Sequence, residues 1–471
     1  MLPLMGAILI PLSLAFWSKP ERLLKLVIIA GIFPAAAVLQ LGGFCLQPTL
    51  APGLTFISYI VLQKLLGVRY PGEASVRTLS MGMLFNLIWA VLGSQIMPRL
   101  FRNEVLVWPQ KQDAAGTLSL LAPNFGNITQ DAYLIINVVL MVLTAQYLTR
   151  RNLDIAEFYK TYVFTGWLLV GICVWQFAAR TVHVPFPRSF FYSNTGWSVL
   201  DAQTAGPVPR INASFTEPAA CASYLAGVVF STIWLTLKGY RVRGMRALIW
   251  ASSIALCLTT STTGFGAIAV GLILLPVLVV LTGHSRLLGR IGQLAMIGAL
   301  ILGVAGATVA TFSPKVITAA QSVASGTAEK KQSASYQERS QVDLDSMAAF
   351  RNTYGLGTGW GSNRSSSLIP GLLATIGIIG VICLLVFDWQ LAKAAGWAIR
   401  VAPLSMEGMA IEGFLAAIVG RLIAAILSSP TIGMPDFYVM LGIVIAAISR
   451  IKLEAWSRGT VTRSHALERH E

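Results

Sequence analysis

The residues of this chain that could do chemistry gather in two polar segments, and the first ends Arg210-Ile-Asn-Ala-Ser-Phe-Thr-Glu217-Pro218. Pro218 suits the first turn of a helix, and Ser214 or Thr216 is expected to cap that helix. Glu217 therefore falls at a helix N-terminus, where two interpretations stay open. Its carboxylate is either stabilised by the helix dipole alone or positioned as a general base near Arg210.

The second segment is a glycine turn between arginines, Arg351-Asn-Thr-Tyr-Gly-Leu-Gly-Thr-Gly-Trp-Gly-Ser-Asn-Arg364. Glycine lets a backbone approach an anion closely, and guanidinium groups bind phosphate oxygens with paired hydrogen bonds and stay charged. We therefore expect a pyrophosphate site here. Its expected ligands are Arg210, Arg339, Arg351, Arg364, Gly359, Gly361 and Ser362. The alternative is that these arginines reach toward lipid headgroups and bind no substrate.

Two further groups of residues are open to a functional and a structural interpretation. Arg421 lies in the apolar run Gly413–Ser429, where a charge at the membrane midplane costs about 2.5–3.5 kcal/mol on insertion scales. Arg421 is expected either to bind phosphate or to pair with Glu412 or Glu407. A set of aromatic residues precedes Arg210 and is expected either to stack on sugar rings or to form an interfacial belt: Phe186, Phe190, Phe191, Tyr192 and Trp197.

The sequence also indicates which cofactors are not needed. The glycine turn lacks the Gly-Lys-Ser/Thr ending of a nucleotide-binding P-loop, and no strand-to-helix context precedes it. No group of histidine, cysteine and aspartate residues has the spacing of metal ligands, so we expect no metal and no other cofactor. The five cysteines fall in or beside apolar runs and are expected to be core residues rather than disulfides.

These segments need a scaffold, and the composition indicates that lipid surrounds it. Hydrophobic residues make up 55% of the 471 residues and charged residues 12%, whereas soluble domains carry about 25% charged residues. A water-facing surface of this size is therefore excluded. Counting an ambiguous run at Leu54–Leu66, we predict an all-α, polytopic bundle of about 12–14 transmembrane spans. The other apolar runs are Met1–Trp17, Leu26–Cys45, Leu79–Met97, Ala132–Leu148, Thr161–Phe177, Ala219–Leu237, Ala247–Leu258, Phe265–Thr282, Ile291–Val309, Leu368–Phe387, Phe414–Leu427 and Tyr438–Ile448.

The positive charges predict the orientation of this bundle. Every second connection is short and basic: Lys19–Lys25, Lys64–Arg77, Arg150–Lys160, Lys238–Arg246, Arg286–Arg290, Lys393–Arg400 and the tail Arg450–Arg469. The positive-inside rule places these connections in the cytoplasm, so the N-terminus is expected outside and the C-terminus inside. Anchoring beside anionic lipids then explains the formal charge of +15, and no nucleic-acid partner is expected.

The remaining connections are long and are expected outside, at about Pro98–Thr129, Arg180–Thr216 and Thr311–Ser367. The third is expected to combine a flexible loop at Gln321–Gln337 with a short amphipathic helix in Glu338–Arg351. The expected organisation is N-terminal spans 1–179, a loop 180–216 with the catalytic arginine, central spans 217–311, a large loop 312–367, C-terminal spans 368–449 and a basic cytoplasmic tail 450–471.

Three groups of residues resemble the Wzy-type polysaccharide polymerases, which belong to the O-antigen ligase/polymerase group of bacterial inner-membrane glycosyltransferases. They are Arg210-x-x-x-Ser214-Phe215-x-Glu217-Pro218, Leu258-Thr-Thr-Ser261-Thr-Thr-Gly264, and Arg351-x-x-x-Gly355-x-Gly357-x-Gly359-x-Gly361-Ser362-x-Arg364-x-Ser366. The resemblance covers the order of features from Arg210 to Leu385. One pattern of the family, an arginine followed eleven residues later by a glycine, is missing here. The residue eleven after Arg210 is Cys221, and Gly361 lies ten residues after Arg351.

The resemblance implies a GT-C-like helical fold in the bacterial inner membrane, with a large, partly helical periplasmic loop. It implies that the chain polymerises undecaprenyl-pyrophosphate-linked oligosaccharide repeat units without a metal. Arg210, Arg351 and Arg364 would then stabilise the departing pyrophosphate, and Glu217 would deprotonate the acceptor hydroxyl. The implied partners are the lipid-linked glycan donor and acceptor, membrane lipid, and a flippase and a chain-length regulator of the same pathway.

Three alternatives remain open from the sequence. An O-antigen ligase commonly carries a histidine in its large periplasmic loop, and Thr311–Ser367 contains none. A flippase for lipid-linked oligosaccharides, which is a transporter, usually has repeat-related halves and short loops, and no internal repeat is found. A peptidoglycan polymerase of the shape, elongation, division and sporulation type would carry its own motifs, and we find none of them.

Overall fold

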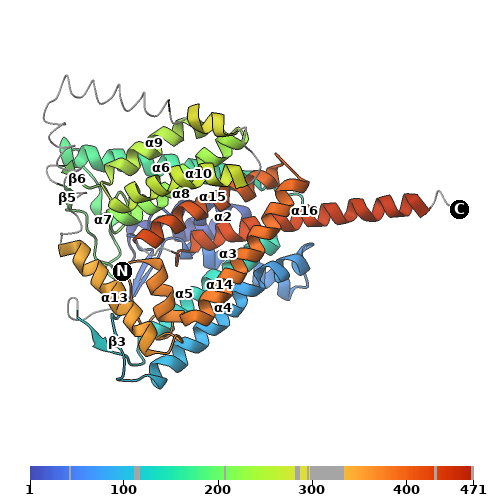
Figure 1. Cartoon of the computed structure of the whole chain (residues 1–471). Helices are drawn as coiled ribbons and strands as arrows, with labels where there is room; N and C mark the ends of the chain where they lie inside the picture. The colour runs from blue at the N-terminus through green and yellow to red at the C-terminus, as the bar shows by residue number, and fades with distance from the viewer. Residues whose placement is uncertain are drawn as a thin grey trace.

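The computed structural model describes residues 1–41, 44–110, 117–205, 208–281, 287–293, 296, 334–428 and 432–467. These residues are mostly helical (Figure 1). The helices are α1 (Leu4–Ala15), α2 (Pro20–Ala30), α3 (Leu50–Leu65), α4 (Glu73–Leu100), α5 (Phe125–Leu148), α6 (Ala156–Thr181), α7 (Arg188–Phe191), α8 (Pro218–Lys238), α9 (Met245–Leu258), α10 (Thr262–Leu281), α13 (Ala334–Asn352), α14 (Leu368–Val401), α15 (Met406–Leu427) and α16 (Pro435–Leu467).

Within the described residues, three short antiparallel hairpins lie in the connections, a feature that the all-α prediction did not include. They pair β1 (Leu39–Leu41) with β2 (Phe44–Leu46), β3 (Leu106–Val107) with β4 (Ser119–Leu120), and β5 (Thr204–Ala205) with β6 (Val208–Pro209). Strands this short add little to the core. They tie the two ends of a connection together, so that polar segments between helices keep a defined course.

The helices have the lengths and composition of a polytopic helical membrane protein. Among the described residues, six helices are long and apolar enough to cross a bilayer, namely α4, α5, α6, α8, α14 and α15. Others, such as α1 and α9, are apolar but have only 12 and 14 residues. A helix of that length extends about 18–21 Å, short of the ~30 Å hydrocarbon core. The described residues therefore hold fewer full spans than the 12–14 that the sequence predicts.

One predicted span is wrong and two predictions fall largely outside the described residues. The apolar run Leu26–Cys45 is not one helix, because α2 ends at Ala30 and the chain turns into the β1–β2 hairpin. A Cβ atom on Gly31 would lie 2.7 Å from Asp436 Cγ, so this turn needs a glycine pressed against α16. The expected span Ile291–Val309 lies mostly outside the described ranges. So does the expected loop Gln321–Gln337, apart from its last residues, which are helical in α13.

The core forms where α8 packs against α15. A Cβ on Gly227 of α8 would lie 2.9 Å from the Ala417 carbonyl oxygen, and one on Gly420 of α15 would lie 2.8 Å from that of Ala226. Small residues let two membrane helices approach this closely. α8 is accordingly the most enclosed of the six candidate spans, with 83% of its apolar window buried.

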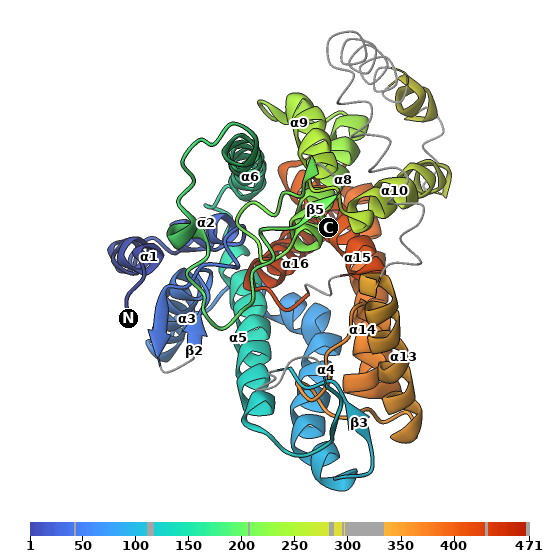
Figure 2. The same cartoon turned by 90° about the vertical axis from the view of Figure 1, so that its left-hand side faces the viewer.

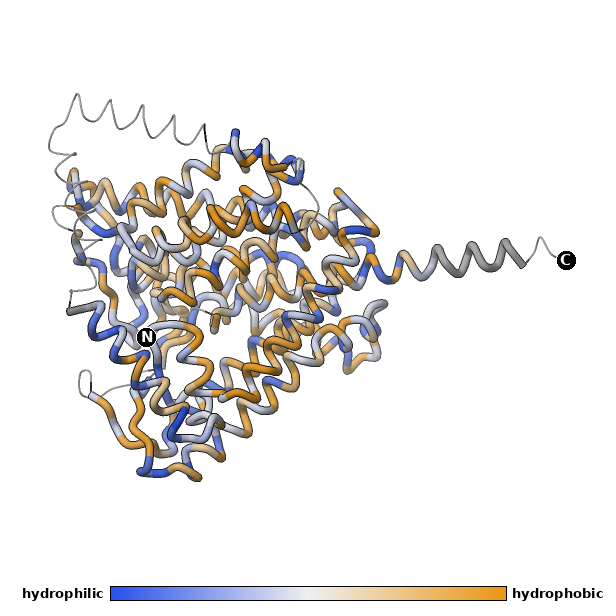
Figure 3. Tube along the Cα trace, viewed as in Figure 1, coloured by the Kyte–Doolittle hydropathy of each residue, from blue (hydrophilic) through white to orange (hydrophobic). Residues whose placement is uncertain are grey.

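The described parts of the three long connections expected outside gather at one end of the bundle. Figure 1 shows α7, α13, β3, β5 and β6 along one side of the molecule and α16 running out from the opposite side. We call these the loop end and the far end. Figure 2 views the loop end, with α4, α5 and α14 below α15 and with α8 and α9 above it. Figure 3 shows hydrophobic residues dominating the helices, whereas hydrophilic residues mark α13 at the loop end.

Candidate substrate cavity

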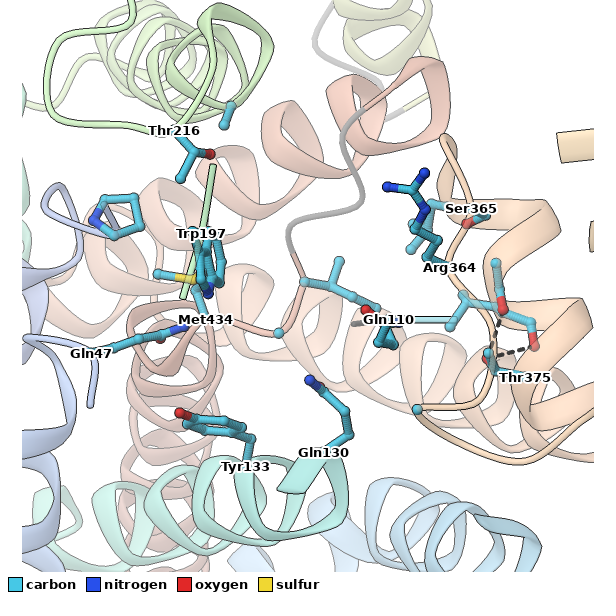
Figure 4. Close-up of a pocket in the computed structure, with 18 of the residues that line it drawn as sticks. Gln47, Gln110, Gln130, Tyr133, Trp197, Thr216, Arg364, Ser365, Thr375 and Met434 are labelled. Atoms are coloured by element: carbon cyan, nitrogen blue, oxygen red, sulfur yellow. Dashed lines mark hydrogen bonds between the residues drawn. The ribbon is translucent and has the colours of Figure 1, made fainter. Parts of the chain in front are cut away.

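A cavity of about 410 Å³ lies at the loop end, where α5, α8, α14 and α15 meet the segments that connect them. Figure 4 shows Arg364 on one side of it and Gln47, Gln130 and Tyr133 on the other. Its lining contains four of the nine site residues that the sequence predicts: Glu217, Gly361, Arg364 and Arg421.

Glu217 lies at the N-terminus of α8, as the sequence predicts, but neither Ser214 nor Thr216 caps this helix. Glu217 is itself the N-cap residue and Pro218 follows it in the first turn. The Ser214 hydroxyl donates instead to the carbonyl of Ile32. The Glu217 carboxylate is 24% exposed and accepts a hydrogen bond of 3.2 Å from Arg339. A cation therefore holds the acidic group, which makes no capping hydrogen bond to the helix.

Arg210 and Arg339 add positive charge beside this carboxylate without lining the cavity themselves. Arg339 is fixed on its other side by a 3.0 Å hydrogen bond to the Ser428 hydroxyl. The Arg210 backbone is held by Arg180, whose guanidinium donates to the Arg210 carbonyl at 2.8 Å. Burial and, after it, the charge of Arg339 lower the pKa of Arg210, and Glu217 opposes this shift. The guanidinium stays charged at neutral pH.

Arg364 lines the cavity, and contacts with Trp108 hold it in place. Its amide donates to the Trp108 carbonyl at 2.8 Å, and its guanidinium lies over the Trp108 ring, 5.6 Å from the centroid. In the part of the chain that the structure describes, no hydrogen bond or ion pair satisfies the guanidinium groups of Arg210 and Arg364, and both Nε atoms are buried. Unpaired buried guanidinium groups are costly, so this arrangement favours an anionic ligand.

The predicted helix in Glu338–Arg351 is confirmed as part of α13, and it positions the loop that carries Arg364. Asp343 accepts hydrogen bonds from the backbone amides of Ser366 and Ser367, at 2.8 and 3.1 Å. It therefore holds, from a neighbouring helix, the two residues that lead into α14. On the next turn of α13, Ser346 accepts a 2.9 Å hydrogen bond from Asn363. α13 is thus a scaffold for residues 363–367.

The glycine turn packs against neighbouring helices and does not face open space. Gly355, Gly357, Gly359 and Gly361 all have positive φ values, between 79° and 92°. A Cβ on Gly359 would lie 2.8 Å from the Gly93 carbonyl oxygen of α4. One on Gly361 would lie 2.9 Å from the Gln130 side chain of α5. The turn therefore needs glycine to pack between α4, α5 and α14, which differs from the expected contact with an anion.

Besides Arg210 and Arg339, three predicted ligands do not line the cavity. Gly359 is enclosed by α4, and Ser362 is 1% exposed and accepts a 2.7 Å hydrogen bond from Asn127. Arg351 lies on the exposed side of α13, twelve residues along that helix from Arg339. That separation corresponds to about 18 Å along the axis. The geometry gives Gly359 and Ser362 a packing role and leaves Arg351 away from Glu217.

Arg421 lines the cavity, but its partner is neither of the two that the sequence suggested. Its guanidinium donates to Asp436 at 2.6 Å, and the two side chains are 5% and 2% exposed. Glu412 lies nine residues back on the same helix, about 13.5 Å along the axis. Glu412 pairs instead with Lys238, and Glu407 pairs with Arg450. A buried pair of this kind is neutral overall, so Arg421 offers the cavity less charge than its type implies.

Sequence reasoning missed three glutamines that line the cavity. One is Gln110, whose side chain donates to the Asn363 carbonyl at 3.2 Å, and the other two are Gln47 and Gln130. Gln47 is 8% exposed and Gln130 is half-buried. Each lies two residues from the end of a predicted apolar run, Leu26–Cys45 or Ala132–Leu148. A polar amide at such a boundary is the one signal that could have found them.

The aromatic residues before Arg210 lie in two different surroundings. Four of them pack among themselves, with the rings of Phe186 and Phe191 stacked at 4.9 Å and Phe190 and Tyr192 in contact with this pair. Trp197 alone lines the cavity.

The lining of the site thus combines cations and one carboxylate with uncharged hydrogen-bonding groups. Among the described residues, no group of three or more histidine, cysteine, aspartate or glutamate side chains is arranged to hold a metal ion. A scan against protein-family models finds no match for this chain, and a search of curated proteins finds none either.

Proposed function

We propose that this chain polymerises undecaprenyl-pyrophosphate-linked oligosaccharide repeat units. The observation that carries the proposal is the cavity itself, where Glu217 stands beside Arg339 and the unpaired guanidinium of Arg364 points in from the opposite segment. Cations without protein partners suit a pyrophosphate, and a carboxylate next to them suits proton transfer from a hydroxyl group.

The reaction follows from these groups. The acceptor hydroxyl oxygen bonds to the anomeric carbon of the donor glycan while the bond from that carbon to the pyrophosphate oxygen breaks. The electron pair leaves with the pyrophosphate, whose growing charge Arg364, Arg339 and Arg210 stabilise. The hydroxyl proton passes to Glu217. Arg351, which the sequence placed among the catalytic residues, has no part in this scheme because it lies away from the cavity.

The proposal includes a GT-C-like bundle in a bacterial inner membrane, with the loop end and the N-terminus in the periplasm. Its support is the separation of charges along the helices. The basic connection after α8 begins at Lys238, 21 residues from Glu217 at the other end of that helix. The basic tail continues α16 away from the loop end. Substrates carried by lipid on the outer leaflet would then reach the cavity from the membrane.

Deletion of the gene in its native host tests the proposal against its alternatives. A polymerase mutant accumulates single repeat units on lipid at the outer face of the membrane, where an added glycosidase can cleave them. A flippase mutant retains them inside, and a ligase mutant accumulates long polymer on the lipid. Restoration of polymer by the wild-type gene and by Arg102→Ala, an exposed arginine beyond α4, is the control. Either of the other two patterns overturns the assignment.

A further inference from the structure

The cavity has a second wall whose chemistry differs from that of the arginines. Gln47, Gln130, Tyr133 and Trp197 form this amide wall, and Figure 4 shows the first three facing Arg364 across the cavity. We propose that the amide wall binds an uncharged sugar, the one bonded directly to the pyrophosphate. This inference rests on the proposed function and adds to it the class of the first sugar.

The amides of the wall have free hydrogen-bonding capacity. Within the described part of the chain, neither the Gln47 nor the Gln130 side chain has a hydrogen-bond partner, and the Gln47 Oε1 atom is buried without one. Gln47 is more than nine-tenths buried, at 8% exposure. A buried polar group without a partner costs free energy unless a ligand satisfies it. The Gln47 amide therefore points to a ligand with matching groups, and the half-buried Gln130 amide is available to the same ligand.

Sugar hydroxyl groups provide that match. A primary amide offers two donors and one acceptor oxygen, and a hydroxyl group both donates and accepts, so one amide can bind neighbouring hydroxyls. Trp197 adds an indole that is 44% exposed at the cavity. The negative face of an aromatic ring attracts the weakly positive C–H groups on one side of a pyranose ring. Amides and an open indole together favour a polyhydroxylated ring over a lipid chain.

The same wall disfavours an acidic sugar. None of its four residues carries a positive charge, and Arg421, the cation lining the cavity nearby in α15, is already paired with Asp436 at 2.6 Å. The carboxylate of a uronic acid would lose its hydration there without gaining a cation. The uncharged hexoses and N-acetylhexosamines avoid this loss.

Three short-chain analogues separate the walls: geranyl pyrophosphate, its N-acetylglucosamine conjugate and its glucuronic acid conjugate. Their affinities are measured by calorimetry on the full-length protein in lipid nanodiscs. We expect the N-acetylglucosamine conjugate to bind about tenfold or more tightly than geranyl pyrophosphate, and the glucuronic acid conjugate to gain nothing. Gln47→Leu and Gln130→Leu should each remove most of that gain while leaving the affinity for geranyl pyrophosphate unchanged. Gln341→Leu, on the exposed side of α13, should change neither affinity.

The outcomes distinguish this inference from the proposed function. If geranyl pyrophosphate binds in a manner that requires Arg364 but the neutral sugar adds no affinity, the pyrophosphate site stands and the amide wall is wrong. Equal gains from the neutral and the acidic sugar also overturn the inference, as does a gain that survives both glutamine substitutions. If no analogue binds, the proposed function fails and the inference fails with it.

Discussion

Buried or half-buried charged residues lie near both ends of α8, but the two groups differ in how many partners they have. At the far end, Glu412 accepts hydrogen bonds from Trp234 at 2.9 Å and Tyr240 at 3.3 Å and pairs with Lys238. At the loop end, the guanidinium groups of Arg210 and Arg364 have no hydrogen-bond or ion-pair partner among the described residues.

Arg450 repeats the pattern of the far end. It donates to the carbonyls of Leu153 and Arg151, at 3.0 and 3.2 Å, and pairs with Glu407. Buried charges that have several partners stabilise one arrangement of helices. Charges left without partners at a cavity are available to a ligand. The number of partners, rather than the type of residue, therefore distinguishes the binding cations from the structural ones.

The largest effect, a loss of stability, is expected at Arg421, which lines the cavity and is paired with Asp436. Asp436→Ala leaves Arg421 buried without its partner, and breaking such a pair costs about 3–5 kcal/mol. We expect a large fall in the amount of folded protein, measured by thermal unfolding in detergent. Replacing both residues, as Arg421→Met with Asp436→Leu, should recover most of the lost stability. Normal stability of Asp436→Ala would show that Arg421 has another partner.

Arg364→Ala tests the unpaired charge directly. Removing one group that stabilises transition-state charge typically costs about 100-fold or more in rate, so polymer length and amount should collapse while the protein level stays normal. Gel analysis of the glycan, with immunoblotting of the membrane fraction, measures both. Arg102→Ala is the matched control. Full-length polymer from the Arg364 variant would refute its role.

Glu412→Gln tests the paired charges of the far end. Lys238 then loses its anionic partner, and we expect a loss of about 1–3 kcal/mol in the free energy of unfolding. The activity of each folded molecule should remain normal, because this cluster lies a helix length from Glu217. A drop in polymer per molecule without a drop in stability would place the far end in the mechanism and break the comparison.

Asp343→Ala tests how the loop end is positioned. The substitution removes the acceptor for the amides of Ser366 and Ser367, just before α14, a loss of about 1 kcal/mol. A modest decrease in melting temperature and a partial decrease in polymer are expected together. Asp343→Asn keeps an acceptor oxygen and should restore much of both. An unchanged melting temperature would show that α13 does not support α14.

The smallest effect is expected at Arg351. Its guanidinium is exposed on α13 and away from the cavity, and surface charges away from a site contribute little. Polymer from Arg351→Ala should stay within about threefold of wild type, a change typical of surface substitutions. Complete loss of polymer at normal protein level would restore the assignment made from the sequence and extend the site beyond the cavity.

The sequence by itself determined the helical membrane character, the position of Glu217 at the start of α8 and the helix that became α13. These are local properties: hydropathy over about twenty residues, a proline at a first turn, and apolar residues at helical intervals. Each depends on neighbours in the chain, so each can be read without knowing the fold.

The tertiary structure alone decided which charges meet. Arg421 found Asp436 rather than Glu412, because the pairing depends on how α15 approaches α16. The glycine turn around Gly359 packs closely against α4 and not against an anion. Gln47 lines the cavity because the predicted span before it ends near Gly31. Contacts between distant segments depend on packing that no local pattern encodes, which is why residue types predicted the chemistry but not its full set of residues.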